Sequence, residues 1–378
     1  MTNRERAMAA LTYKPYDRLP IAHFGYWNET LEKWAEEGHI DQDEAEYWGD
    51  GNDYDRSIGE KLGFDFNWGW CRAGIHADLL PGFDREVVKD FGDGRRHVRN
   101  GYGVVELERD GAVSIAQEIE HLLVDRPSWE AHYLPRLQFQ PDRVQKDWLS
   151  YLRAEFEGGR AREDTPRGIH AGSLYGKFRD WAGVTGTSYI YADDEELYEE
   201  ILRTMGNLAY RVLEESLALC VPGMFDYALF WEDICFKNGP LVIPAVFEAL
   251  VGPHYKRMTA LLKDYGVEIV SLDCDGCIDS LVPIWLKNGV NTMFPVEVGT
   301  WSGSIAPWRE KYGRELRGVG GMNKNVFSQD FNAVDQEIER LRPLVALGGF
   351  IPCPDHRIAP DAKWENVRYY TRRMKEEF

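Results

Sequence analysis

Short apolar segments rich in β-forming residues recur along this chain, and they alternate with longer stretches of helical periodicity. The clearest apolar segments are residues 19–24, 168–172, 224–230, 267–272, 292–295 and 349–351. Apolar residues at helical spacing mark 197–219, 244–265 and 334–342, and we expect Pro343 to end the last of these helices. Alternating β and α units predict a parallel sheet covered by helices, and eight such units close a (β/α)8 barrel.

One part of the chain departs from this alternation. Residues 101–108 alternate like a half-buried strand, and Asp110 with Gly111 forms a typical hairpin turn dipeptide. The prediction is therefore an α/β fold, a (β/α)8 TIM barrel with an N-terminal helical extension and a β-hairpin insertion at about 87–134. The length of 378 residues and the lack of a linker or repeat predict a single domain over 1–378.

Composition restricts the partners of the chain. With 63 acidic and 44 basic side chains the net charge is −19, which disfavours nucleic acid. No apolar run approaches the roughly 20 residues of a membrane helix, and the N-terminal residues lack the features of a secretory signal, so we expect no membrane association and a cytoplasmic location. The six cysteines are too few for a disulfide framework, and 13 Trp, 19 Tyr and 17 Phe offer material for an aromatic-lined pocket.

In a barrel of this kind the catalytic side chains follow the C-terminal ends of the strands. The polar and aromatic residues in such positions are His23, Tyr26, Trp27, His170, Ser173, Tyr175, Trp231, Glu232, Asp233, Asp273, Asp275, Glu297, Asn323, Lys324, Cys353, Asp355 and His356. Carboxylates crowded with a histidine can act as general acid and base, because repulsion and burial raise carboxyl pKa values. The same groups can bind a divalent metal, and the alternative for each residue is a local cap or surface ion pair.

Other patterns are weaker or missing. Cys274 and Cys277 have the spacing of a redox or zinc motif, but no second such pair accompanies them. Gly320 and Gly321 precede Lys324 and predict a tight turn with a pocket-facing lysine. No G-x-S-x-G or H-E-x-x-H motif is present, which argues against the commonest hydrolase and zinc-peptidase classes.

A series of short motifs spans nearly the whole chain in a characteristic order. They lie at residues 3–6, 9–11, 17–20, 272–276, 291–297, 320–324 and 348–356. In these motifs the sequence resembles the uroporphyrinogen decarboxylase superfamily. The resemblance implies a (β/α)8 barrel with its site at the C-terminal end of the strands, and the superfamily includes both decarboxylases and corrinoid-linked methyltransferases.

At two motifs the sequence differs from the superfamily pattern, and these differences restrict the activities that the resemblance implies. Uroporphyrinogen decarboxylases carry an arginine-rich segment after the first strand, whereas residues 23–29 here contain no arginine, so the clamp for an octa-anionic substrate is missing. The thiol-methylating branch has a zinc motif H-x-C-G where this chain has Asp273-Cys274-Asp275-Gly276, and Cys353 lies where the distant zinc cysteine belongs. Zinc therefore stays an open expectation, with Asp273, Asp275, Glu297 and Cys353 as candidate ligands.

The remaining pattern resembles the O-demethylating branch that works with corrinoid proteins. It implies transfer of a methyl group from a small methoxylated compound, an aromatic methyl ether in our expectation, to the cobalt(I) of a corrinoid (cobalamin) carried by a partner protein. An oxide is a poor leaving group, so an acid must assist it, and the candidates are Asp275, Glu297 and His356. The expected substrate-binding residues are His23, Phe24, Tyr26, Trp27, His170, Tyr175, Trp231, Asp233, Trp301 and Asn323.

Two other functions stay open at this point. One is decarboxylation of a small carboxylic acid, or an activity of the uroporphyrinogen decarboxylase type, and the other is a barrel that binds a ligand without turnover. The sequence leaves the methyl donor, the metal, the identity of the acid and a homodimeric state undetermined.

Overall fold

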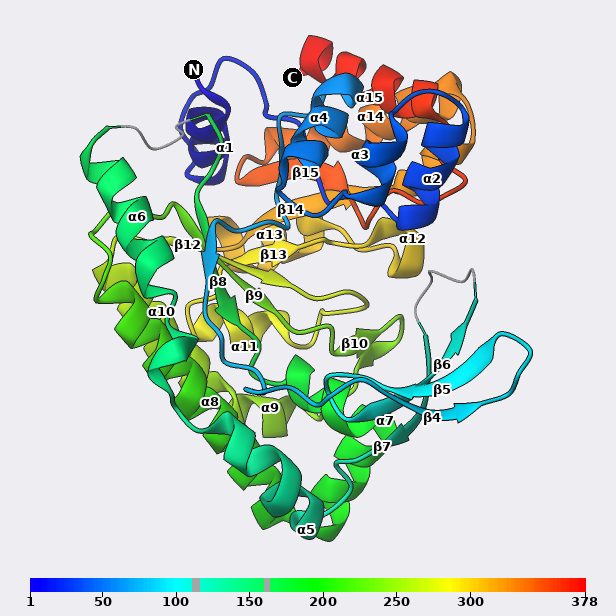
Figure 1. Ribbon diagram of the computed structural model, residues 1–378. Helices are drawn as coiled ribbons and strands as arrows, with labels where there is room; N and C mark the ends of the chain where they lie inside the picture. Colours follow the sequence, from blue (N-terminus) through cyan, green and yellow to red (C-terminus); the bar gives the residue numbers. More distant parts are fainter. Residues whose placement is uncertain (111–115, 160–163) are drawn as a thin grey trace.

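The structure is a computed structural model that describes residues 1–110, 116–159 and 164–378. At its centre lies a parallel sheet in which each strand pairs with its neighbour in chain order (Figure 1). Within the described ranges the strands are β3 (Ala73–Gly74), β8 (Gly168–Gly172), β9 (Tyr227–Trp231), β12 (Ile269–Asp273), β13 (Thr292–Phe294), β14 (Arg317–Met322) and β15 (Phe350–Pro354).

The first and last strands lie side by side and close the wall. β1 (Ala22–His23) pairs in parallel with β2 (Phe66–Asn67), which belongs to the same segment as β3. On the other side of β1, the Ile358 N–H donates to the Gly25 carbonyl at 3.1 Å and the Trp27 N–H donates to the Ile358 carbonyl at 3.2 Å. Counting β2 and β3 as one interrupted strand gives eight positions among the described residues, and the expected (β/α)8 barrel is confirmed.

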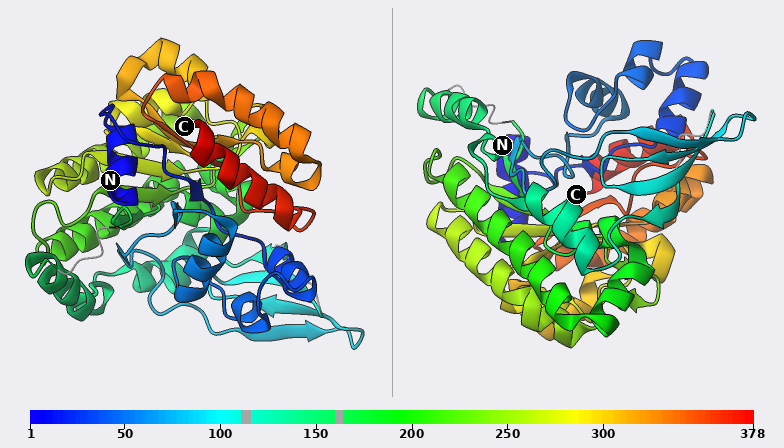
Figure 2. Two further views of the ribbon diagram at one scale, coloured as in Figure 1. Left: turned by 90° about the horizontal axis from the view of Figure 1, so that it is seen from above. Right: turned by 60° about the horizontal axis from the view of Figure 1, so that its bottom comes forward.

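Helices surround the barrel, and the C-terminal pair α14 and α15 lies along one side of it (Figure 2). The helices outside the insertion are α1 (Asn3–Leu11), α2 (Asn28–Glu36), α3 (Gln42–Glu46), α4 (Asp53–Leu62), α6 (Lys146–Glu157), α7 (Gly176–Asp193), α8 (Glu195–Leu217), α9 (Pro244–Leu250), α10 (Gly252–Asp264), α11 (Val282–Lys287), α12 (Val298–Trp301), α13 (Ile305–Tyr312), α14 (Phe331–Ala346) and α15 (Trp364–Glu377). No helix in the described part of the chain is long and apolar enough to span a membrane.

The three helices predicted from periodicity have different outcomes. The helix predicted at 197–219 is α8. The one predicted at 244–265 is two helices, α9 and α10, which meet at Val251 because Pro253 has no N–H and starts a new helix. The expectation that Pro343 ends a helix is wrong: α14 continues to Ala346, since burial of Leu344 and Val345 outweighs one lost hydrogen bond near its end.

The predicted β insertion is a four-stranded antiparallel sheet that projects from the barrel (Figure 2). Its strands are β4 (Glu86–Asp90), β5 (Arg95–Arg99), β6 (Val104–Arg109) and β7 (Gln117–His121), followed by α5 (Arg126–Ser128). Of the predicted turn dipeptide, Gly111 lies outside the described residues. The Tyr133 hydroxyl donates to the Tyr102 carbonyl at 2.9 Å, which fixes the turn that presents Tyr102 to the barrel.

The register of neighbouring strands shows which side chains face the barrel interior. Trp68, which follows β2, stacks on Tyr227 with ring centroids 4.4 Å apart, and its Nε1 donates to the Ser271 hydroxyl at 3.4 Å. Alternation along β9 and β12 therefore points Trp231 and Asp273, which are directly paired in register, into the same interior. Both are the last residues of their strands, so they lie at the C-terminal opening of the barrel, called the mouth below.

Candidate active site

Asp273 contributes a carboxyl group without a partner to the mouth. Its side chain makes no hydrogen bond or ion pair with any described residue. Burial, together with the charges of Asp275 and Asp233, raises the pKa of Asp273 well above its usual range, and Arg357 only partly opposes this. These surroundings favour the protonated form of the carboxyl group, which can donate a proton.

A second carboxyl group at the mouth is paired with a histidine. Asp275 Oδ2 lies 3.2 Å from His356 Nε2, while Asp275 Oδ1 and His356 Nδ1 are buried without partners among the described residues. The His356 ring stacks on Trp27 with centroids 5.5 Å apart and meets the edge of Phe24 at 5.7 Å. The structure thus brings two of the predicted acids together, and each retains a free polar atom for a ligand.

Glu297 and Asp233 complete the acidic groups of the mouth. Glu297 accepts the Gly276 N–H at 2.6 Å and the Thr300 hydroxyl at 2.8 Å, and burial together with Asp275 raises its pKa. Burial also raises the pKa of Asp233, although an ion pair with Arg179 at 2.6 Å counteracts the shift. Both carboxyl groups already have partners, which makes them weaker candidates for a proton donor than Asp273.

Aromatic side chains form the walls of the mouth. Phe24 packs against Phe294 with ring centroids 4.4 Å apart, and Phe294 is paired in register with Asp273. On the other side of β12, the Lys177 ammonium lies over the ring of Trp231, 4.9 Å from the ring centroid. A flat ligand in this space would contact rings while it faces the carboxyl group of Asp273.

Lys177 connects the mouth to the insertion. Its ammonium donates to the Tyr102 hydroxyl at 2.8 Å and pairs with Asp180 at 3.2 Å. Burial and this positive charge lower the pKa of His170 to about 4, so His170 is a neutral ring at the mouth. Lys177 and Tyr102 were not among the predicted site residues. Lys177 lies in the first turn of α7 and Tyr102 lies in the insertion. A search for polar residues directly after barrel strands therefore does not find them.

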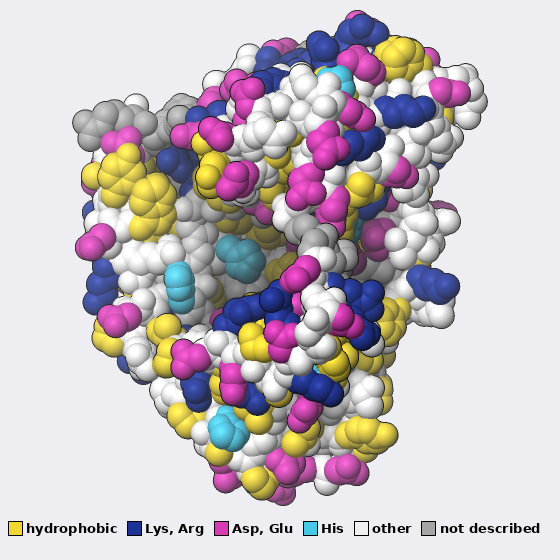
Figure 3. Space-filling view, turned by 45° about the vertical axis from the view of Figure 1, so that its right-hand side comes forward, with side chains coloured by type: hydrophobic (Ala, Val, Ile, Leu, Met, Phe, Trp, Pro, Cys, Tyr) yellow, Lys and Arg dark blue, Asp and Glu magenta, His cyan; other side chains and the backbone are white. Residues whose placement is uncertain are grey.

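Figure 3 shows the face on which β10 (Cys235–Phe236) and α12 lie in Figure 1. A hollow enters this face, with a histidine side chain inside it and Lys and Arg side chains gathered along its lower edge. The ammonium of Lys177, 4.9 Å from the Trp231 ring, shows that the mouth also holds positive charge, although the chain as a whole carries a charge of −19. Arg357, a further basic group, pairs with Asp50 at 2.5 Å and reaches the ring of Phe24 at 5.9 Å.

Several predicted site residues lie away from the mouth. Tyr26 is buried against Trp34 and Trp48, and the Tyr175 hydroxyl accepts a hydrogen bond from Tyr198 in the helical layer. Trp301 packs on Trp308 of α13 with centroids 6.0 Å apart. These residues follow strand ends in sequence, but their side chains point into packing between elements.

Two more of the predicted site residues, Asn323 and Cys353, make contacts elsewhere. The Asn323 side chain accepts the Asn325 N–H and caps a 3-10 turn. Cys353 is fully buried and lies near Tyr370 of α15. Burial is the main cause of the raised pKa of the Tyr370 hydroxyl, and the nearby Cys353 adds to the shift. The thiol therefore faces the outer helices.

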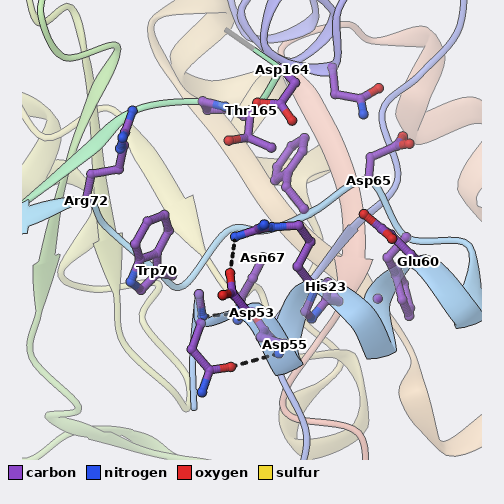
Figure 4. Close-up of a pocket in the computed structure, with 18 of the residues that line it drawn as sticks. His23, Asp53, Asp55, Glu60, Asp65, Asn67, Trp70, Arg72, Asp164 and Thr165 are labelled. Carbon is purple, nitrogen blue, oxygen red and sulfur yellow. Dashed lines mark hydrogen bonds and ion pairs between the residues drawn. The ribbon is translucent and has the colours of Figure 1, made fainter. Parts of the chain in front are cut away.

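His23 borders a separate cavity of about 570 Å³ on the flank of the barrel (Figure 4). The Gly25 N–H donates to His23 Nδ1 at 3.1 Å, and burial lowers the pKa of this histidine, so the ring is neutral. Carboxylates of α4 and of the segment before β2 surround the cavity, including Asp55, Glu60 and Asp65. Asp55 accepts hydrogen bonds from the Gly51 N–H and the Asn67 side chain, and Asp65 forms an ion pair with Arg18. Unlike the carboxyl group of Asp273, these two carboxylates therefore have partners.

The candidate metal ligands do not fit a metal site. Within residues 1–110, 116–159 and 164–378, no three His, Cys, Asp or Glu side chains are grouped so that they could hold a metal ion. Glu297 is engaged by Gly276 and Thr300, and Cys353 faces α15.

No known protein family matches this sequence, and neither does any curated protein. Among solved structures, a methyltransferase from Methanosarcina mazei aligns with 100% of this chain and 99% of its own length, at a TM-score of 0.61 and 14% identity. The chain has the fold of this methyltransferase. A putative vitamin-B12 independent methionine synthase from Listeria monocytogenes aligns with 96% of this chain and 98% of its own length, at 12% identity and a TM-score of 0.43. The barrel implied by the resemblance to the uroporphyrinogen decarboxylase superfamily is thus confirmed at the level of the fold.

Proposed function

We propose that this protein transfers a methyl group from a small aromatic methyl ether to the cobalt(I) of a corrinoid protein. The observation that carries the proposal is the carboxyl group of Asp273, which lies without a partner among the aromatic walls of the mouth. The shared fold with a methyltransferase supports methyl transfer as the class of reaction. The sequence resemblance supports the ether as donor and the corrinoid protein as acceptor.

The reaction needs an acid because the departing oxygen is a poor leaving group. The cobalt(I) nucleophile of the partner supplies the electron pair for the new bond to the methyl carbon. As the carbon–oxygen bond breaks, its electron pair stays on the oxygen, and the Asp273 carboxyl group donates a proton to that oxygen. The products are a phenol and the methylated corrinoid.

The other groups of the mouth have supporting roles in this proposal. Phe24, Phe294 and Trp231 contact the ring of the substrate. The charges of Asp275 and Asp233 help to keep Asp273 protonated, because a second negative charge nearby is unfavourable. In this proposal the pair of Asp275 and His356 returns a proton to Asp273 after turnover.

The deciding experiment is an anaerobic incubation with a reduced corrinoid protein and a panel of methoxylated aromatic compounds. We expect the cobalt(I) absorbance to convert to that of methylcobalt(III) only when this protein and a suitable ether are present. Release of CO2 from small carboxylic acids without a corrinoid protein would instead establish a decarboxylase. Ligand binding without either reaction would point to a non-catalytic barrel.

A further inference from the structure

Lys324 is a lysine of the mouth whose ammonium group has no partner. It begins the short 3-10 turn Lys324–Ser328, directly after β14 and the cap residue Asn323. Its side chain is half-buried, and no carboxylate oxygen of a described residue lies within 4.0 Å of its Nζ. The ammonium group is therefore available to donate hydrogen bonds to a ligand at the mouth.

Three carboxylates around Lys324 are engaged with other groups. Asp355 accepts three backbone N–H groups, from Val298 and Gly299 on Oδ2 and from Lys324 itself on Oδ1. Glu297 accepts from Gly276 and Thr300, and Asp275 pairs with His356. Acidic side chains are therefore near, yet none of them takes up the ammonium group.

The backbone of Lys324 is held rigidly at the site. Because Asp355 binds the N–H groups of Val298, Gly299 and Lys324, it ties together the segments that follow β13, β14 and β15. Burial lowers the pKa of Lys324, while the charges of Asp355, Asp275 and Glu297 oppose this shift. Asp275 also contributes to the raised pKa of Asp273, so Lys324 and the proposed proton donor share a neighbouring carboxylate.

We propose that Lys324 donates a hydrogen bond to the oxygen that departs from the methyl ether, and so selects substrates whose leaving group is a phenolate. The inference rests on the proposed function and adds a catalytic residue to it. The ammonium keeps its proton throughout and stabilises the negative charge that builds up on the oxygen as the carbon–oxygen bond breaks. The proton that completes the phenol comes from Asp273.

A binding experiment tests Lys324 without any methyl transfer. The probe is 4-nitrophenol, whose phenol and phenolate forms differ in absorbance, titrated with pH in the presence of the protein. We expect the protein to favour the phenolate, and Lys324→Met to lose this preference by about tenfold to a hundredfold, the contribution of a hydrogen bond to a charged group. Lys324→Arg should retain most of it, and Lys256→Met on the exposed face of α10 should behave like the wild type.

A kinetic experiment then separates the two proposals. In a series of substituted anisoles, Lys324→Met should show a steeper fall of the methyl transfer rate with the pKa of the departing phenol than the wild type does. An unchanged phenolate preference in Lys324→Met overturns the role of Lys324. A lysine-dependent preference for phenolate without methyl transfer to any corrinoid protein would overturn the proposed function and leave the phenolate site in place.

Discussion

Asp273 and Asp275 are two residues apart at the end of one strand, yet they have different surroundings. Asp273 is the last residue of β12, so the alternation of the strand directs it into the barrel beside Trp231. Asp275 lies beyond the strand and meets His356, which follows β15. The sequence identified Asp275, Glu297 and His356 as candidate acids and Asp273 only as a candidate metal ligand, because the type of a residue does not reveal whether its hydrogen bonds are satisfied.

At this scale the proposed mechanism makes a prediction for Asp273→Asn. The variant should transfer methyl groups at least about a hundredfold more slowly, since general acid catalysis typically contributes that much. Anisoles with strongly electron-withdrawing substituents should be affected less, because their oxygen needs less protonation. Initial rates of methylcobalt(III) formation measure both effects, and Asp264→Asn on the exposed end of α10 is the matched control.

The pH dependence follows from the raised pKa of Asp273. The active form is protonated, so the rate should be constant at low pH and fall as the pH increases through that pKa. The fall should lie above the ordinary range of aspartate, and it should disappear in Asp273→Asn. A wild-type profile without such a decrease would mean that another group delivers the proton.

Among the elements, β14 shows how closely the strands at the mouth approach one another. Gly320 has a φ of 121°, and a Cβ on it would lie 1.5 Å from the Pro295 carbonyl oxygen. The same carbonyl accepts the Gly321 N–H at 2.9 Å. The glycine pair, which in the sequence predicts only a tight turn before Lys324, is thus required for contact between β14 and the segment after β13.

Gly320→Ala should therefore be severely destabilising. The methyl group cannot be accommodated without moving the backbone, and we expect a loss of more than about 3 kcal/mol in the free energy of unfolding. The matched control is Gly38→Ala, where φ is 79° but nothing lies within 4 Å of the added Cβ, so only a backbone cost of roughly 1–2 kcal/mol applies. Urea denaturation of both variants measures the difference, and similar losses would contradict the steric explanation.

Over the whole molecule, Asp226 links the N-terminal helix to the barrel. Arg4 of α1 binds Asp226 at 2.7 Å, and the buried Arg167 before β8 pairs with it at 3.3 Å. Burial opposes ionisation of Asp226, but Arg4 and Arg167 outweigh it and lower the pKa of the carboxyl group. A carboxyl group with a lowered pKa stabilises the fold at neutral pH, and this contribution is lost as the pH falls below about 4, the value in an unfolded chain, through the folded pKa.

Asp226→Asn should lower the free energy of unfolding at pH 7 by about 3 kcal/mol, because Arg167 would remain buried without its charge partner. Its stability should also depend less on pH below about 4 than that of the wild type. Asp17→Asn removes an exposed aspartate that pairs with Arg6 of α1, and should cost much less than Asp226→Asn because an exposed ion pair is screened by water. Thermal unfolding across this pH range compares the three proteins, and equal losses would contradict a structural role for Asp226.

The sequence alone predicted the barrel: the alternation of β and α periodicity indicated an α/β fold, and the resemblance to a barrel superfamily implied that its sheet closes. It missed β2 and β3, because residues 66–74 are interrupted by polar and aromatic residues and carry no continuous apolar run. It also indicated the strand ends as the place of chemistry, which local order along the chain can reveal.

Only the tertiary structure decided which of those residues meet. Tyr26 and Tyr175 follow strand ends and Cys353 lies within β15, but all three pack into other layers, whereas Lys177 and Tyr102 reach the mouth from α7 and the insertion. The physical reason is that a side chain's direction and its hydrogen-bond partners depend on register and on contacts between residues far apart in the chain. The unpartnered groups of Asp273 and Lys324, on which the proposed chemistry rests, are properties of that packing.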